Sequence, residues 1–136
     1  MQVWGIGAYW NSAEDQSEFF VRNSVAALGW PEERAPSLCA MMNEMQMGDI
    51  IYIKSFTIRT KTLNIKAIGK ITGYTYTDDV LFGGRKKAVP VKWLYTGGVL
   101  KYGLTEEDGI NNVYSHTLYR EYSPGIIRLL NNYIDF

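Results

Sequence analysis

The sequence predicts an α+β domain in which a β-sheet curls into a small barrel flanked by two or three helices. Strand signals dominate the middle of the chain, whereas helix signals occur early and at the end. The chain has 136 residues, 46% hydrophobic and 21% charged, which suits one globular domain with its own core. We therefore treat residues 1–136 as a single domain.

The N-terminal third predicts one strand and two helices. The strand covers 2–8, where apolar residues alternate. The first helix is expected to follow the polar segment 11–15 and to end at Gly29, with apolar residues on helical spacing at Phe19, Phe20, Val25 and Leu28. The second begins near Ser37, and the residues that we expect it to bury in the core are Leu38, Met41, Met42 and Met45.

Three further strands and a last helix are predicted after Gly48. Residues 49–54 are almost continuously apolar and indicate a central strand, and 63–71 alternate like a half-exposed one. The segment between them looks too long for a tight hairpin. Pro90 marks the strand predicted over 88–95 as an edge strand or a strand beginning. The tail predicts a short helix over 124–130, with 133–136 packing back on the body.

The charge is zero overall but unevenly distributed. Residues 51–101 carry ten basic and two acidic side chains. This basic segment suits weak or local contact with phosphates, and the alternative is an ordinary solvated sheet face. Cys39 is the single cysteine, so no disulfide forms within the chain. With no signal peptide and no long apolar run, we expect a cytoplasmic protein that does not enter membranes.

Residues that carry catalysis are scarce. His116 and Cys39 have no neighbours in sequence that complete a nucleophile–base arrangement. The adjacent carboxylates at 78–79 and 106–108 lack the spacing of a metal site. We expect no catalytic residue, no metal and no cofactor. An enzyme, such as a nuclease that uses Lys54, Tyr9 or a carboxylate, is the less favoured alternative.

Aromatic side chains are the most informative class, at 14% of the chain. The segment 9–11 leaves the first strand, the segment 54–56 leaves the central strand, and Trp30 follows the first predicted helix. Aromatic rings and polar groups at converging strand ends make a pocket for a flat heterocycle, which the rings stack on and the polar groups read. The alternative is that these rings belong to the core or rim of a small barrel.

The chain resembles the EVE and YTH group of the PUA-like superfold over roughly residues 3–96. The motifs that carry the resemblance, in order, are Trp4-Gly5-Ile6-Gly7-Ala8, Leu28-Gly29-Trp30, the run from Gly48 to Phe56, Ala67-Ile68-Gly69-Lys70-Ile71 and Val91-Lys92-Trp93-Leu94-Tyr95. The resemblance implies a curled barrel flanked by helices. It also implies binding of a modified nucleobase, flipped out of DNA or RNA, in an aromatic cage.

The resemblance also implies the roles of individual residues. Trp30 corresponds to a cage wall, and Trp93 to a structural tryptophan. The residues that border the pocket are Tyr9, Trp10, Asn11, Lys54, Ser55 and Phe56. A further cage aromatic is expected after Ile71, with candidates Tyr74, Tyr76 and Phe82.

Phosphates are expected to contact Arg59, Lys61, Arg85, Lys86 and Lys87 in this interpretation. Stacking on an aromatic ring is worth about 1–3 kcal/mol per base, so Trp30→Ala is expected to weaken binding roughly ten- to a hundredfold. The alternative function is a small adaptor or inhibitor that binds a protein partner, or a module that binds a free nucleotide. Salt separates the two classes, because phosphate contacts weaken steeply with ionic strength and an apolar protein interface does not.

Overall fold

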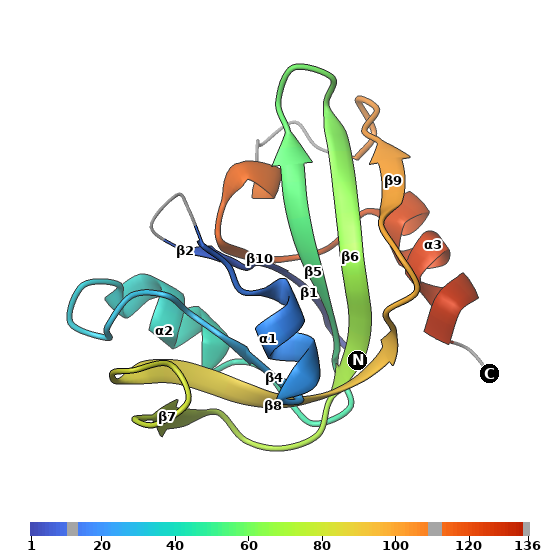
Figure 1. Cartoon of the computed structure of the whole chain (residues 1–136). Helices are drawn as coiled ribbons and strands as arrows, with labels where there is room; N and C mark the ends of the chain where they lie inside the picture. The colour runs from blue at the N-terminus through green and yellow to red at the C-terminus, as the bar shows by residue number, and fades with distance from the viewer. Residues whose placement is uncertain (11–13, 109–112, 135–136) are drawn as a thin grey trace.

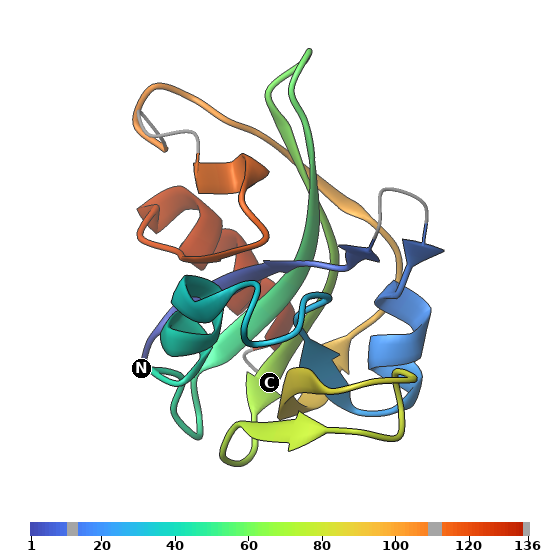
Figure 2. The same cartoon turned by 90° about the vertical axis from the view of Figure 1, so that its left-hand side faces the viewer.

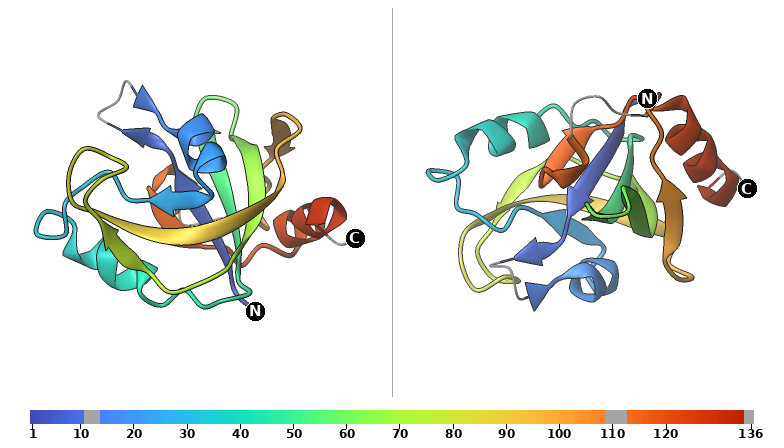
Figure 3. Two further views of the ribbon diagram at one scale, coloured as in Figure 1. Left: turned by 60° about the horizontal axis from the view of Figure 1, so that its bottom comes forward. Right: turned by 90° about the horizontal axis from the view of Figure 1, so that it is seen from above.

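The computed structural model describes residues 1–10, 14–108 and 113–134. It consists of a mixed, curled β-sheet that forms a half-barrel, together with three helices (Figure 1). The curl of the sheet is clearest in Figure 3. The predicted α+β class is confirmed. No helix among the described residues is long and apolar enough to cross a membrane.

The main sheet runs in the order β10-β1-β5-β6-β8-β4, with β7 paired to β8 and β9 to β6. β1 and β5 are parallel, and the other pairs are antiparallel. The helices are α1 (Ser17–Arg22), α2 (Pro36–Met42) and α3 (Pro124–Ile134), with a 3-10 turn η1 (Val113–Ser115). The strands are β1 (Val3–Gly7), β2 (Tyr9–Trp10), β3 (Glu14–Asp15), β4 (Val25–Ala27), β5 (Ile50–Thr57), β6 (Thr62–Ile71), β7 (Tyr76–Asp78), β8 (Lys86–Tyr95), β9 (Leu100–Gly103) and β10 (Leu118–Arg120).

The sheet is covered by apolar side chains on both faces. Ile51 and Ile53 of β5 belong to a cluster that includes buried side chains of α1 and α2, which we call the α1–α2 cluster. Ile50 and Tyr52 belong to a second cluster that includes the buried face of α3, which we call the α3 cluster. Successive residues of a strand point to opposite faces of the sheet. A strand with a hydrophobic core on each face therefore needs apolar residues at every position, as β5 has over 50–53. The prediction of a central strand here is confirmed.

The first helix is shorter than predicted. α1 ends at Arg22, and Val25–Ala27 form β4, which pairs with β8. Ser24 adopts a positive φ of 54°, which ends the helix, and the three residues of β4 are buried. Pairing with β8 therefore overrides the helical spacing of Val25 and Leu28.

Two predictions about the later strands are wrong. β5 and β6 form one long hairpin that pairs as far as Thr57 and Thr62, closed by a short turn in which Lys61 has a φ of 52°. β8 is an interior strand, flanked by β4 on one side and by β7 and β6 on the other. Pro90 lies in the gap between the residues of β8 that pair with β7 and those that pair with β6. Its missing N–H therefore removes no hydrogen bond to either of these two strands.

The other predicted elements are present, but α2 ends at Met42, so Met45 follows the helix. The strands β2, β3, β7, β9 and β10 are additional to the prediction. The α2 stripe is confirmed as core, since Met42 and Met45 are buried and Leu38 and Met41 pack against the α1–α2 cluster. Trp93 is structural: it packs against that cluster, and its Nε1 donates to the backbone oxygen of Phe20 at 3.0 Å. The tail helix is confirmed and longer than expected.

Candidate functional site

A pocket of about 270 Å³ lies where the parallel pairing of β1 with β5 ends. Gly7 and Lys54 stand opposite each other there in the register of the two strands. The wall facing the strand ends comes from η1 and the residues that follow it (Figures 1 and 2). We call this the strand-end pocket; its lining residues are Gly7, Tyr9, Lys54, Ser55, Phe56, Ile58, Tyr114, Ser115, His116 and Thr117.

Lys54 is the most unusual residue of the strand-end pocket. Its side chain is only 6% exposed. Nζ donates hydrogen bonds to the backbone oxygens of Tyr114, at 2.9 Å, and His116, and it lies 5.4 Å from the ring centroid of Tyr119. Within the described part of the chain, no carboxylate forms an ion pair with it. Burial lowers the pKa of Lys54 to about 8.

This buried lysine gives folding stability a characteristic pH dependence. The pKa is about 8 in the folded protein against 10.5 for an ordinary lysine, so the unfolded chain binds more protons between these values. We expect the free energy of unfolding to rise by about 2–3 kcal/mol between pH 8 and pH 10, as the burial penalty of the ammonium is relieved. Urea unfolding at both pH values measures the rise, and Lys54→Met should remove it. If the free energy of unfolding rose equally with pH in the wild type and in Lys54→Met, Lys54 would not be the group responsible.

A buried polar network fixes the floor under Lys54. The carboxylate of Glu121, 4% exposed, accepts hydrogen bonds from the hydroxyls of Tyr52 at 2.5 Å and Tyr114 at 2.9 Å. The hydroxyls of Tyr52 and Tyr119 lie 2.7 Å apart. Burial raises the pKa of Glu121 and of all three tyrosines. These contacts hold the ring of Tyr119 beneath Nζ and hold the segment whose carbonyl binds it.

The open side of the strand-end pocket carries aromatic and hydroxyl groups. Tyr9 is 58% exposed, and Phe56 lies 6.4 Å from Tyr114 between ring centroids. Among the described residues, no group forms a hydrogen bond with the Ser55 hydroxyl. The site therefore combines a buried cation, two rings and a hydroxyl, which is an arrangement suited to a flat polar ligand that carries negative charge.

Sequence reasoning found one half of this pocket and missed the other. Tyr9, Lys54, Ser55 and Phe56 are brought together as predicted. The missed half is 114–117, from a segment far along the chain. The only available signal was His116, the single histidine, and its backbone oxygen rather than its imidazole holds Lys54.

The structure places the other predicted aromatics elsewhere. Trp10 is in the core, with its ring centroid 5.0 Å from that of Phe82, and it does not line the strand-end pocket. Trp30 is 44% exposed after β4 and does not line the strand-end pocket. Tyr74 and Tyr76 are exposed just before and in β7. Asn11 lies outside the described residues.

The predicted phosphate contacts separate into two groups. Arg59 and Lys61 are exposed in the β5–β6 turn, directly after Ile58 of the strand-end pocket. The residues 85–87 lie beside β7, at the opposite end of the molecule (Figures 1 and 2). There Lys86 and Lys87 line a separate cavity of about 360 Å³, and the guanidinium of Arg85 is 3.5 Å from Asp79. Only the first group is near the strand-end pocket.

Metal binding has no candidate in the described part of the chain. Across 1–10, 14–108 and 113–134, no three histidine, cysteine or carboxylate side chains are grouped to hold an ion.

Comparison with known proteins identifies a structure with a similar fold and gives no information about the ligand. The NMR structure of Rpa0253 from Rhodopseudomonas palustris is similar, with a TM-score of 0.52 at 15% sequence identity, over 99% of this chain and 94% of that one. No protein-family model matches the sequence, and no curated protein matches it. The similarity spans the whole chain and shows a shared fold.

Proposed function

We propose that this protein is a non-catalytic binding module that takes a nucleobase of DNA or RNA into the strand-end pocket. The observation that carries the proposal is the buried Lys54 ammonium, which has no acidic partner among the described residues and lines the same pocket as the exposed Tyr9. A buried charge is costly unless it is compensated, and an anionic ligand supplies the missing compensation. A nucleotide combines such a negative charge with a flat ring.

Each part of the ligand has a partner in this proposal. The base stacks on Tyr9 and Phe56, and the hydroxyl of Ser55 reads its edge. Lys54 receives the phosphate, and Arg59 and Lys61 on the neighbouring turn contact the phosphates that follow. The volume of about 270 Å³ is slightly below the usual range of pockets for drug-sized ligands, which suits one flat group rather than a longer segment.

We place the module in the EVE and YTH group of the PUA-like superfold, whose members bind modified bases. Support comes from the quoted motifs of the sequence and from a curled half-barrel with three flanking helices. In this chain the proposed aromatic wall is Tyr9, which lines the strand-end pocket, rather than Trp30, which does not. We therefore expect the bound base to be a modified one. The side chains around the Tyr9 ring would determine which modification fits.

Tyr9→Ala is expected to weaken binding roughly ten- to a hundredfold, because it removes a stacking partner worth about 1–3 kcal/mol. The measurement is a fluorescence titration with short single-stranded DNA and RNA, with and without methylated cytosine or methylated adenine. Trp30→Ala, which removes an exposed ring outside the pocket, is the matched control and should bind normally. If Trp30→Ala loses affinity and Tyr9→Ala does not, the base lies at Trp30 and the pocket is wrongly assigned.

A second candidate function is binding of a protein partner. It is favoured by large apolar side chains exposed around β7, at the opposite end from the β5–β6 turn. These residues are Tyr74, Tyr76, Val80 and Leu81. Nucleic-acid binding at the strand-end pocket should weaken steeply with salt, whereas association through this apolar face should change little.

A further inference from the structure

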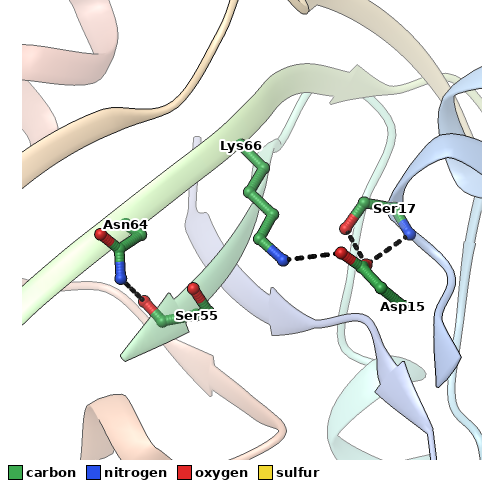
Figure 4. A network of polar contacts seen from close by, with 5 residues as sticks. All are labelled: Asp15, Ser17, Ser55, Asn64 and Lys66. Carbon is green, nitrogen blue, oxygen red and sulfur yellow. Dashed lines mark hydrogen bonds and ion pairs between the residues drawn. The ribbon is translucent and has the colours of Figure 1, made fainter. Parts of the chain in front are cut away.

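The strand-end pocket is supported by a strand that contributes nothing to its lining. Asn64 and Lys66 lie two residues apart on one face of β6, and Figure 4 shows both reaching toward neighbouring elements. Nδ2 of Asn64 donates to the backbone oxygen of Ser55 at 3.4 Å and to the hydroxyl of Thr57 at 3.1 Å. One side of the pocket is thereby tied to β6 at the end of β5.

Lys66 connects β6 to the other side of the pocket, which carries Tyr9. Its Nζ is 3.0 Å from Oδ2 of Asp15 and 5.3 Å from the ring centroid of Tyr9, so the same ammonium contacts a carboxylate and an aromatic ring. Asp15 and Tyr9 are directly opposite in the register of β2 and β3. Oδ1 of Asp15 also accepts hydrogen bonds from the backbone N–H of Ser17, at 2.9 Å, and its hydroxyl, at 2.5 Å (Figure 4).

The ribbon that carries Tyr9 is anchored in the core through Trp10, but successive strand residues point to opposite faces, so this anchor lies on the face opposite the Tyr9 ring. β2 and β3 form a separate two-stranded sheet of two residues each. An isolated two-stranded ribbon is at best marginally stable in water. On the Tyr9 face, the Lys66 ammonium contacts both Asp15 and the Tyr9 ring, so the position of this exposed ring depends on Lys66. Burial alone would raise the pKa of Asp15, but the hydrogen bonds from Ser17 and Lys66 outweigh it and lower this pKa, so the carboxylate stays charged for the ion pair.

We propose that the Asp15–Lys66 ion pair is a positioning device that holds the Tyr9 ring at the mouth of the strand-end pocket. The inference rests on the proposed function, in which Tyr9 stacks on the base. Asp15 and Lys66 are positioning residues here, because they act on the ligand through Tyr9. The pair is partly exposed, with side chains 19% exposed for Lys66 and 39% for Asp15, so it orders the ring rather than stabilising the fold.

Lys66→Met keeps the aliphatic stem and removes the charge. We expect it to weaken binding of single-stranded oligonucleotides about three- to tenfold, the range that a partly exposed ion pair and a cation–π contact support together. Lys70→Met, an exposed lysine of the same strand, is the control and should have no more than the small effect of one lost surface charge. The decisive arm repeats Lys66→Met in a Tyr9→Ala background, where it should have no further effect.

Two outcomes would overturn the inference. One is an equal loss of affinity from Lys66→Met with and without Tyr9, which would mean direct contact between Lys66 and the ligand. The other is an unchanged affinity in Asp15→Asn, which keeps an acceptor for Ser17 and removes the negative charge that pairs with Lys66.

A ligand-free measurement separates this inference from the proposed function. NMR of the Tyr9 ring should show a changed ring resonance in Lys66→Met and an unchanged one in Lys70→Met. If the wild-type protein binds no oligonucleotide while the ring responds in this way, the proposed function is wrong and the ion pair still positions Tyr9. If the ring does not respond, the positioning role is wrong whatever the protein binds.

Discussion

Lys54→Met is expected to lower the affinity for single-stranded nucleic acid roughly 10- to 150-fold, an effect at least as large as that of Tyr9→Ala. A hydrogen bond to a charged group is worth about 1.5–3 kcal/mol, and the Lys54 ammonium has no other counter-charge in the described part of the chain. Methionine has a similar length and fills the same space, so the pocket keeps its shape. Titration of both proteins with the same oligonucleotide measures the difference.

The same substitution should leave the fold nearly as stable. It removes the cost of burying a charge, and it also removes the donor to the backbone oxygens of Tyr114 and His116. These two changes oppose each other, so we expect the free energy of unfolding at pH 7 to change by only about 1 kcal/mol. A variant that keeps its affinity while folded would show that the ammonium has a purely structural role.

Gly5→Ala is expected to have the largest effect on stability. Gly5 is paired with Tyr52 on one side and Tyr119 on the other. A Cβ there would lie 2.5 Å from Cζ of Tyr119, whose hydroxyl is held 2.7 Å from that of Tyr52. Because the ring is buried and tied in place, relief requires movement of the network. Overpacking of this kind costs about 1–3 kcal/mol, which chemical denaturation measures directly.

Gly103→Ala is the matched control for this prediction. Gly103 is also a strand residue with no positive φ, but a Cβ there meets no atom within 4 Å. We expect no loss of stability, since alanine in open space avoids the entropic cost of glycine. Equal stability of the two variants would mean that the Tyr119 ring moves freely, and the network under Lys54 would then not be rigid.

The central strands were predictable from sequence because their pattern is local. The alternation over β6 and the apolar run of β5 follow from which face each side chain occupies. β4 was not predictable in the same way, because Val25–Ala27 become a strand only through pairing with β8, more than sixty residues along the chain. The helical spacing of nearby apolar residues indicated the wrong element for that reason.

The candidate site likewise contains residues that local patterns predict and residues that only long-range packing brings in. Tyr9 follows β1, and the run 54–56 begins at the last residue of β5 that pairs with β1. The meeting of these residues therefore follows from the parallel pairing of the two predicted strands. The positions of Trp30 and Trp10 depend on β4 and on the packing of Gly29 against the Trp10 ring, where a Cβ would lie 2.8 Å from that ring. No periodicity in 114–117 marks these residues as a pocket wall, because their backbone oxygens rather than their side chains hold Lys54.

Amide NMR spectra recorded during titration with a single-stranded oligonucleotide that carries a methylated base show directly where the protein binds it. We expect the largest shifts in the strand-end pocket, at Gly7, Tyr9, Ser55, Phe56 and His116, and in the adjoining turn. Shifts concentrated instead at Trp30 and the residues 85–87, with the pocket unchanged, would contradict the proposed site.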